Sequence, residues 1–237
     1  MSGYTNGFGQ PVGPAVEAWS ERRRPERTAI DGRYCRIEPV DLERHAVALF
    51  ESYMQAPDGR DWTYLFAERP ASIGLFRDYL AKLAASIDPL HYAIVARTYD
   101  KAVGTAALMR IDPVHGVLEV GSIGYSPLLK NTQAGTEAMY LLMWRVFEEL
   151  RYRRYEWKCD SLNAPSCTAA RRYGFRFEGI FRNAIVYKNR SRDTAWFSII
   201  DEEWPRIRAA FQMWLDPQNF DAAARPRRAL AAIRESI

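Results

Sequence analysis

Apolar residues recur along the chain at two spacings, one of three to four residues and one of two residues. The first spacing is typical of amphipathic helices, and short alternating runs are typical of half-buried strands. Helical spacing predicts helices over residues 41–53, 72–85, 132–150, 164–173 and 202–214. Strands are predicted over residues 33–40, 91–98, 102–111, 117–125, 155–160, 175–186 and 192–201. The predicted fold class is therefore α/β, of the α+β kind.

The connections between these elements indicate a mixed, mostly antiparallel sheet. The longest predicted helix joins residues 117–125 to residues 155–160, and such a crossover makes the two strands parallel and right-handed. Residues 33–215 are expected to form one domain. Glycine and proline punctuate residues 1–32, which are predicted to be an N-terminal extension, and residues 216–237 are predicted to be a helical tail.

The junction over residues 119–138 carries the strongest chemical signal. A strand there leads through a short turn into a helix. The first amides of a helix lack partners inside it, and the helix dipole favours negative charge at that end. This arrangement predicts an anion site suited to a pyrophosphate, although a helix entered through a plain turn would give the same pattern. A second segment, residues 163–175, would supply a partner helix.

These segments resemble the motifs of the GNAT acetyltransferase superfamily, and are most similar to its Rim-type, ribosomal-protein N-acetyltransferase-like branch. The resemblance covers about residues 33–215. The cofactor loop of the family, Gln/Arg-x-x-Gly-x-Gly/Ala, is represented by Lys130-Asn-Thr-Gln-Ala-Gly135, with Gln133 in place of the middle glycine. The second family pattern is matched by Asn163, Ser166, Gly174 and Phe175. The resemblance implies the GNAT fold, with splayed parallel strands 4 and 5 and helices on both faces of the sheet.

The resemblance also implies acetyl-CoA as the co-substrate. The start of the 132–150 helix is expected to hold the pyrophosphate, and the backbone at the end of the preceding strand is expected to hold the pantetheine arm. The implied cofactor-binding residues are Ile123, Gly124, Tyr125, Lys130, Asn131, Thr132, Gln133, Ala134, Gly135, Thr136, Asn163 and Ser166.

Two residues are candidates for catalysis. Glu119 precedes the cofactor loop and is the candidate base, acting through water, whereas the alternative is a surface carboxylate in an ion pair. Ser166 is the candidate donor to the thioester sulfur, whereas the alternative is a partner in a helix cap. Many members of the family carry a tyrosine one turn before the Gly-Phe pair, where this chain has Ala170.

The implied activity is transfer of an acetyl group to a primary amine by direct attack in a ternary complex. The acceptor would be a protein N-terminus or a small-molecule amine, bound by Asp61, Trp62 and Tyr64 in the loop between the first two helices. An aromatic loop packed into the core is the alternative for that segment. A non-catalytic module that binds acyl-CoA, or a transferase of a longer acyl group, remains an alternative for the whole protein.

Composition narrows the function classes. The formal net charge is only +4, from 33 basic and 29 acidic residues, which is small for a nucleic-acid-binding protein. Basic clusters at residues 151–154 and 171–176 are expected to flank the cofactor site.

The three cysteines and three histidines show no metal-ligand spacing, so no metal site is expected. The odd number of cysteines indicates a reducing cytoplasm. No membrane segment or signal peptide is predicted. The resemblance makes a homodimer conceivable.

Overall fold

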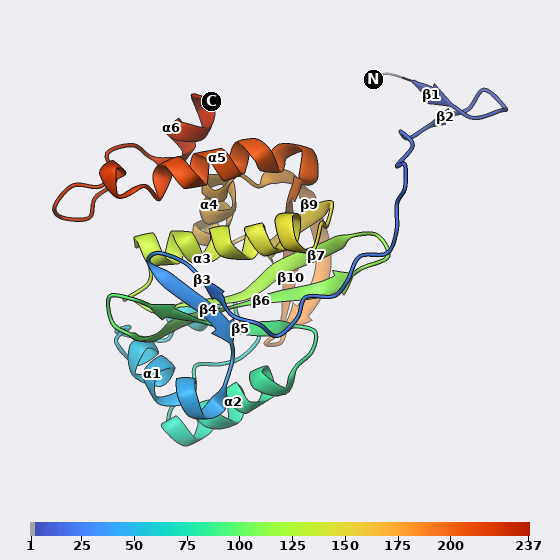
Figure 1. Ribbon diagram of the computed structural model, residues 1–237. Helices are drawn as coiled ribbons and strands as arrows, with labels where there is room; N and C mark the ends of the chain where they lie inside the picture. Colours follow the sequence, from blue (N-terminus) through green and yellow to red (C-terminus); the bar gives the residue numbers. More distant parts are fainter. Residues whose placement is uncertain (1–2) are drawn as a thin grey trace.

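An eight-stranded sheet forms the centre of the computed structural model, which describes residues 3–237 (Figure 1). The strands lie side by side in the order β3-β4-β5-β6-β7-β8-β10-β9. Their bounds are Ile30–Asp31 for β3, Cys35–Pro39 for β4, Leu90–Ala96 for β5, Lys101–Asp112 for β6, Val117–Tyr125 for β7, Arg154–Asp160 for β8, Arg176–Tyr187 for β9 and Arg190–Ile200 for β10. The mixed sheet expected from the sequence is confirmed.

The crossover strands β7 and β8 pair in parallel and then separate. Their register runs from Val117 opposite Arg154 to Val120 opposite Trp157, and beyond this point the two strands no longer pair with each other. β7 nevertheless continues to Tyr125, where it still pairs with β6, and β8 continues to Asp160, where it still pairs with β10. The two strands are therefore splayed at their carboxyl ends, as expected, and main-chain groups of both face the gap.

Helices cover both faces of this sheet (Figure 1). α1 (Leu42–Met54) and α2 (Ile73–Ala85) close one core, and α3 (Gln133–Trp144), α4 (Ala164–Tyr173), α5 (Trp204–Trp214) and α6 (Leu230–Glu235) pack over the other. Local signals set several ends. Asp41 accepts a hydrogen bond from the Arg44 amide, Ser72 caps α2 in the same way, and Gly174 ends α4 with a φ of 103°.

The helix predicted over residues 132–150 is regular only to Trp144. Residues Arg145–Glu149 form a wider π-helical turn. In that turn the buried guanidinium of Arg145 bonds to the carbonyl and hydroxyl of Thr28 and lies 3.2 Å from the carboxylate of Glu149. The π-helical turn therefore contacts the N-terminal segment through Arg145. Such a contact between distant parts of the chain cannot be predicted from helical periodicity.

α3 is also tied to the far edge of the sheet, through Glu137. Its carboxylate accepts hydrogen bonds from the amides of Arg33, Tyr34 and Cys35, at 2.8, 2.6 and 2.8 Å. These amides belong to the turn between β3 and β4 and to the first residue of β4, so one buried side chain holds this turn against α3. Charge-assisted bonds of this kind are the stronger class of hydrogen bond, and they fix where the helix begins relative to the sheet.

The two ends of the chain differ in how they meet the body. β1 (Tyr4–Thr5) and β2 (Pro11–Val12) form a small hairpin that stands away from it (Figure 1). The segment from Trp19 to β3 is docked, because Trp19 donates to the carbonyl of Val114 and Ile30 pairs with Ile37. In residues 216–237 the α-helix expected for the tail is confined to α6, which packs beside α5. Within residues 3–237, no helix has the length and apolar character needed to cross a membrane.

Candidate active site

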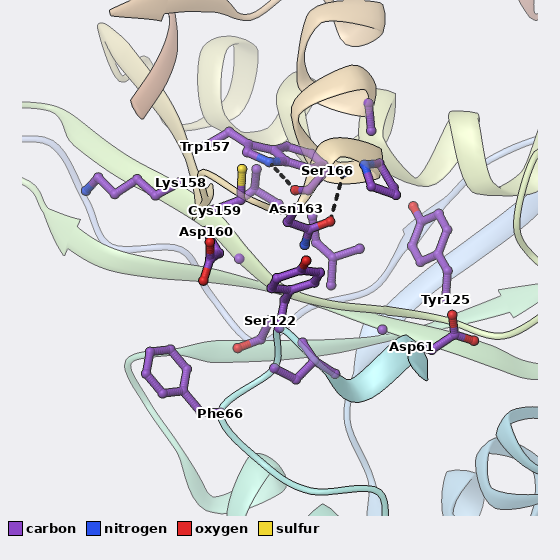
Figure 2. Close-up of a pocket in the computed structure, with 18 of the residues that line it drawn as sticks. Asp61, Phe66, Ser122, Tyr125, Trp157, Lys158, Cys159, Asp160, Asn163 and Ser166 are labelled. Atoms are coloured by element: carbon purple, nitrogen blue, oxygen red, sulfur yellow. Dashed lines mark hydrogen bonds between the residues drawn. The ribbon is translucent and has the colours of Figure 1, made fainter. Parts of the chain in front are cut away.

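A cleft of about 1440 Å³ opens where β7 and β8 separate. It reaches from the first turns of α3 and α4, through the gap between the strands, to the loop that follows α1 and to the inner face of β10. Figure 2 shows Asn163, Ser166 and Trp157 on one side of this space and Asp61 and Phe66 on another. The cleft thus connects the two segments that the sequence singled out with the predicted acceptor loop.

The start of α3 offers unpaired main-chain donors to the cleft. Thr132 is the N-cap, and its hydroxyl accepts a hydrogen bond of 3.0 Å from the Gly135 amide. The amides of Asn131, Gln133 and Ala134 donate to no acceptor in the described part of the chain. With the helix dipole behind them, these three N–H groups can hold an anionic group such as a phosphate.

Gly135 allows the chain to pack closely at this turn. A Cβ at this position would lie 2.5 Å from the carbonyl oxygen of Leu129 and 3.1 Å from the ring of Tyr125. The Tyr125 hydroxyl donates to the Gly135 carbonyl at 2.8 Å and closes the same turn. Gln133, which replaces the middle glycine of the family pattern, occupies the first helical position without a positive φ. A side chain is compatible with the backbone there.

The predicted pantetheine strand contains a β-bulge that sequence reasoning missed. Gly124 lies opposite Thr105 and Gly121 lies opposite Ala107, so two residues of β7 face one residue of β6. One of them, Ser122, has a φ of 48°. The bulge bends β7 at the point where it leaves β8, which turns main-chain groups of Ile123 toward the gap. The sequence signal that could have indicated it is the pair of glycines on either side.

Ser166 is held by two hydrogen bonds at the start of α4. The Oδ1 atom of Asn163, which is the N-cap of this helix, accepts from the Ser166 amide at 3.2 Å. The Oγ atom of Ser166 accepts from the indole Nε1 of Trp157 at 3.0 Å (Figure 2). Trp157 was not among the predicted site residues. Because Ser166 accepts this bond, its own proton remains available to a third group.

Glu119 is buried in an ion-pair network. Its side chain is 6% exposed, and its Oε2 atom lies 3.0 Å from Lys158 Nζ and 3.1 Å from Arg110 Nε. Lys158 also lies 2.6 Å from Glu156. Burial raises the pKa of Glu119, whereas Lys158 and then Arg110 oppose this rise. The carboxylate is therefore both an ion-pair partner and a cleft-lining group, and the sequence offered these as alternatives.

The three predicted acceptor residues lie at the cleft in different ways. Asp61 pairs with Lys130, so the predicted cofactor cation and the predicted acceptor acid contact each other. Tyr64 donates to the Leu162 carbonyl at 3.1 Å and joins the loop to the β8–α4 connection. Trp62 is 5% exposed and packs against Tyr53, as the core-packing alternative described.

Of the two basic clusters expected beside the cofactor site, only Arg172 of residues 171–176 lies at the cleft. Arg172 lines the cleft and donates to the Thr136 hydroxyl at 3.1 Å. Arg151, Arg153 and Arg154 lie before and at the beginning of β8, whereas the cleft opens at its end. The expectation for residues 151–154 was therefore wrong. Residues 151–154 are close in sequence to the cleft-lining residues of β8, but the length of that strand separates them from the cleft.

Residues around α4 bear on which group could protonate the leaving sulfur. Ala170 is fully buried, and the nearby Tyr173 lines the cleft with a pKa raised by burial. The thiols of Cys159 and Cys167 lie 3.6 Å apart, and burial raises the pKa of Cys159 to about 12. A thiol with that pKa stays protonated near neutral pH, which disfavours Cys159 as a nucleophile in the wall of the cleft.

Comparison with known proteins agrees with this geometry. A GCN5-related N-acetyltransferase from Brucella melitensis is 45% identical, and the match covers 93% of this chain and 100% of that chain with a TM-score of 0.91. An uncharacterized N-acetyltransferase of Bacillus subtilis (strain 168) is 26% identical over 113 residues, or 48% of this chain and 65% of that protein. RimJ of Mycobacterium smegmatis shares the fold at 17% identity, over 76% of this chain and 88% of that chain, with a TM-score of 0.62. Residues 35–176 match the family described as Acetyltransferase (GNAT) domain, and the chain belongs to this family.

Proposed function

We propose that the protein is an acetyl-CoA-dependent N-acetyltransferase that moves the acetyl group directly to a primary amine in a ternary complex. The observation that carries this proposal is the cleft through the splayed strands, with the unpaired amides of α3 near one end and the buried Glu119 near the other. A cofactor lying in the gap would have its phosphates at the amides and its thioester beside Ser166.

The cofactor half of the cleft suits coenzyme A. Amides of Asn131, Gln133 and Ala134, with the charge of Arg172 nearby, match a pyrophosphate. The bulged backbone from Ile123 to Tyr125 offers main-chain groups to the pantetheine amides, in the manner of an added strand. RimJ of Mycobacterium smegmatis, which shares the fold, was solved with a CoA disulfide.

Glu119 and Ser166 would divide the proton transfers. An amine attacks only when it is neutral, and Glu119 takes its proton through a water molecule. The amine nitrogen forms a bond to the thioester carbonyl carbon, and a main-chain amide of the splayed segment of β7 stabilises the oxyanion. The carbon–sulfur bond then breaks and leaves CoA thiolate. Ser166, positioned by Trp157, donates a hydrogen bond to that sulfur while the thiolate gains a proton from solvent.

Two measurements test the proposal. Acetyl-CoA should raise the melting temperature of the protein by mass action, and an oligonucleotide at the same concentration should not. Release of free CoA thiol on addition of a panel of amines should then show turnover, with succinyl-CoA as the comparison for a longer acyl group. Binding without thiol release from any amine would favour the non-catalytic module. Absence of any melting shift with acyl-CoA would overturn the proposal.

The three free thiols and the absence of a membrane-spanning helix in residues 3–237 support a cytoplasmic location, which we propose with the activity.

A further inference from the structure

Arg192 is a buried cation without a partner. Its residue is 7% exposed, and the side chain lines the cleft from strand β10. Its guanidinium makes no hydrogen bond and no ion pair with any residue in 3–237, and its Nε atom is completely buried without an acceptor. Burying an uncompensated charge is expensive, so a fold retains one where something else supplies the counter-charge.

Another buried arginine in the same protein shows how the fold satisfies such a group. Arg145, at 2% exposure, donates to the Thr28 carbonyl at 2.8 Å, to the Tyr92 hydroxyl at 3.1 Å and to the Thr28 hydroxyl at 3.0 Å. It also lies 3.2 Å from Glu149. Arg192 has none of these contacts.

Aromatic rings near Arg192 compensate its charge only weakly. The rings of Phe66 and Tyr187 lie with their centroids 6.0 and 5.9 Å from its guanidinium carbon. Both distances are at the outer limit for a cation–π contact. The rings therefore shield part of the guanidinium without replacing hydrogen bonds, and only its Nε atom is fully buried, so its two terminal nitrogens remain open to a group in the cleft.

Arg192 lies on the acceptor side of the sheet. Thr194 lies opposite Asp160 and Trp196 lies opposite Lys158, so these side chains share one face of the sheet. Arg192 lines the same cleft with them, past an irregularity in the pairing of β10 with β9 between Arg192 and Thr194. The α3 amides and Arg172 lie on the other face, with the core around α5. Arg192 is thus separated from the proposed phosphate site.

Within residues 3–237, no carboxylate lies within ion-pair distance of Arg192. The Oγ1 atom of Thr194 and the indole Nε1 of Trp196 are buried in the cleft wall without partners. Asp160 is the nearby carboxylate, and its two oxygens already accept bonds from the Leu162 amide and the Tyr187 hydroxyl, at 2.9 and 2.8 Å. The pocket therefore presents the planar cation of Arg192 to a group that enters the cleft, whereas the buried polar atoms of Thr194 and Trp196 lie within its wall.

We propose that Arg192 forms a subsite for a carboxylate on the acceptor, so that the acceptor is an amino acid or a similar small amine that carries a carboxylate. A carboxylate matches the planar fork of a guanidinium with two parallel hydrogen bonds. The amine of such a molecule would face Glu119 and the thioester. This inference rests on the proposed function for the amine, whereas the anion subsite rests on Arg192 alone.

The binding test uses product-like probes in matched pairs. N-acetyl amino acids and their carboxamides have nearly the same shape, but the carboxamide lacks the negative charge and has an NH2 donor in place of one acceptor oxygen. We expect the acids to bind about 10- to 100-fold more tightly than the carboxamides, measured by thermal shift and calorimetry in the presence of CoA. Arg192→Gln should reduce this ratio to near one and leave the melting shift caused by CoA unchanged. Arg190→Gln, an exposed arginine on the same strand, is the control and should keep the ratio.

The turnover test compares free amino acids with amino acid amides as acceptors. The ratio of kcat/KM for acid and amide should exceed ten in the wild type and collapse in Arg192→Gln. A merely structural role for Arg192 would lower both kcat/KM values together and leave their ratio as it was.

Arg192→Met tests, without any ligand, whether the unpaired charge destabilises the protein. It should melt no lower than the wild type, whereas Arg145→Met should melt lower.

The outcomes separate this inference from the proposed function. If CoA binds but the acids and amides bind alike in the wild type, the carboxylate subsite is wrong and the transferase proposal stands. If acids bind through Arg192 but no acyl-CoA binds, the subsite stands and the transferase proposal falls. Efficient turnover of peptides with neutral N-terminal residues, together with inactivity toward free amino acids, would also overturn the subsite.

Discussion

Oε2 of Glu119 and Nζ of Lys158 lie 3.0 Å apart, on the two strands that separate to form the cleft. Glu119 pairs with Glu156 in the parallel register, and Lys158 stands two residues beyond Glu156, just past Trp157, the last residue of β8 that pairs with β7. The ion pair of Glu119 with Lys158 therefore couples the protonation of the proposed base to the geometry of the splay.

Lys158→Met should move the acidic limb of the kcat/KM profile to higher pH. Burial raises the pKa of Glu119 and Lys158 counteracts this, so its removal raises the pKa further and the base ionises later. A displacement of about one pH unit or more is expected from loss of an opposite charge at this distance. Lys82→Met, on the exposed face of α2, should leave the limb in place. An unmoved limb in Lys158→Met, or full activity in Glu119→Gln, would remove Glu119 from the mechanism.

Ser166→Ala should lower kcat while the affinity for CoA stays within about twofold. The hydroxyl is proposed to act on the leaving sulfur, and groups that assist proton transfer are typically worth about 10²- to 10⁴-fold. Trp157→Phe should show a smaller loss, because it frees the Ser166 hydroxyl from its 3.0 Å bond without deleting it. Stopped-flow thiol release and calorimetry separate the two quantities. Ser161→Ala is the control, and equal losses in both serine variants would count against the role.

Gly135→Ala should destabilise the protein and weaken acyl-CoA binding. The added Cβ would lie 2.5 Å from the Leu129 carbonyl, so the loop before α3 must move, at a cost of about 1–3 kcal/mol. Urea unfolding gives the loss of stability, and the acetyl-CoA melting shift gives the loss of binding. Gly179→Ala in β9 meets no atom within 4 Å and is the matched substitution, expected to change neither value appreciably. Wild-type binding by Gly135→Ala would show that the loop is tolerant.

His91→Phe should protect the protein from acid. Burial, and then the charge of Arg27, lower the pKa of His91 to about 4, whereas an unfolded chain titrates near 6.5. A lowered histidine pKa gives stability that is complete above about pH 6.5 and is lost as pH falls toward 4, because the unfolded state binds the proton first. Between pH 7 and 4.5 the wild type should lose about 2–3 kcal/mol more than the variant. Urea titrations at both pH values measure this difference. His115→Gln, at an exposed position, should lose as much stability between these two pH values as the wild type. An equal loss in His91→Phe would show that His91 does not contribute to acid sensitivity.

Elements with strong local signals were predicted closely. β7 spans Val117–Tyr125 and α4 spans Ala164–Tyr173, both as expected, because alternation marks the first and because Asn163 and Gly174 mark the ends of the second. Mixed sheet, parallel crossover and family were predicted correctly as well. The predictions departed from the structure where distant contacts decide, as at the π-helical turn after Trp144 and in the mostly irregular C-terminal tail.

The candidate site divides in the same way. The residues around Gly135 could be predicted because an anion cradle is built from consecutive amides of one turn. Trp157 escaped prediction because its bond to Ser166 joins a strand to the following helix through side chains alone. Arg192 escaped it because a sequence of alternating residues does not reveal whether a buried charge has found a partner.

Read alone, the chain determined its local periodicities, its caps and turns and the amide-rich junction before α3, because these depend on residues within a few positions of one another. Tertiary structure decided which charges meet: Lys130 with Asp61, Lys158 with Glu119, and Arg192 with no residue in 3–237. Such pairings depend on strand register and on how loops close over the sheet, and the energy of a charge depends on its burial and its neighbours in space.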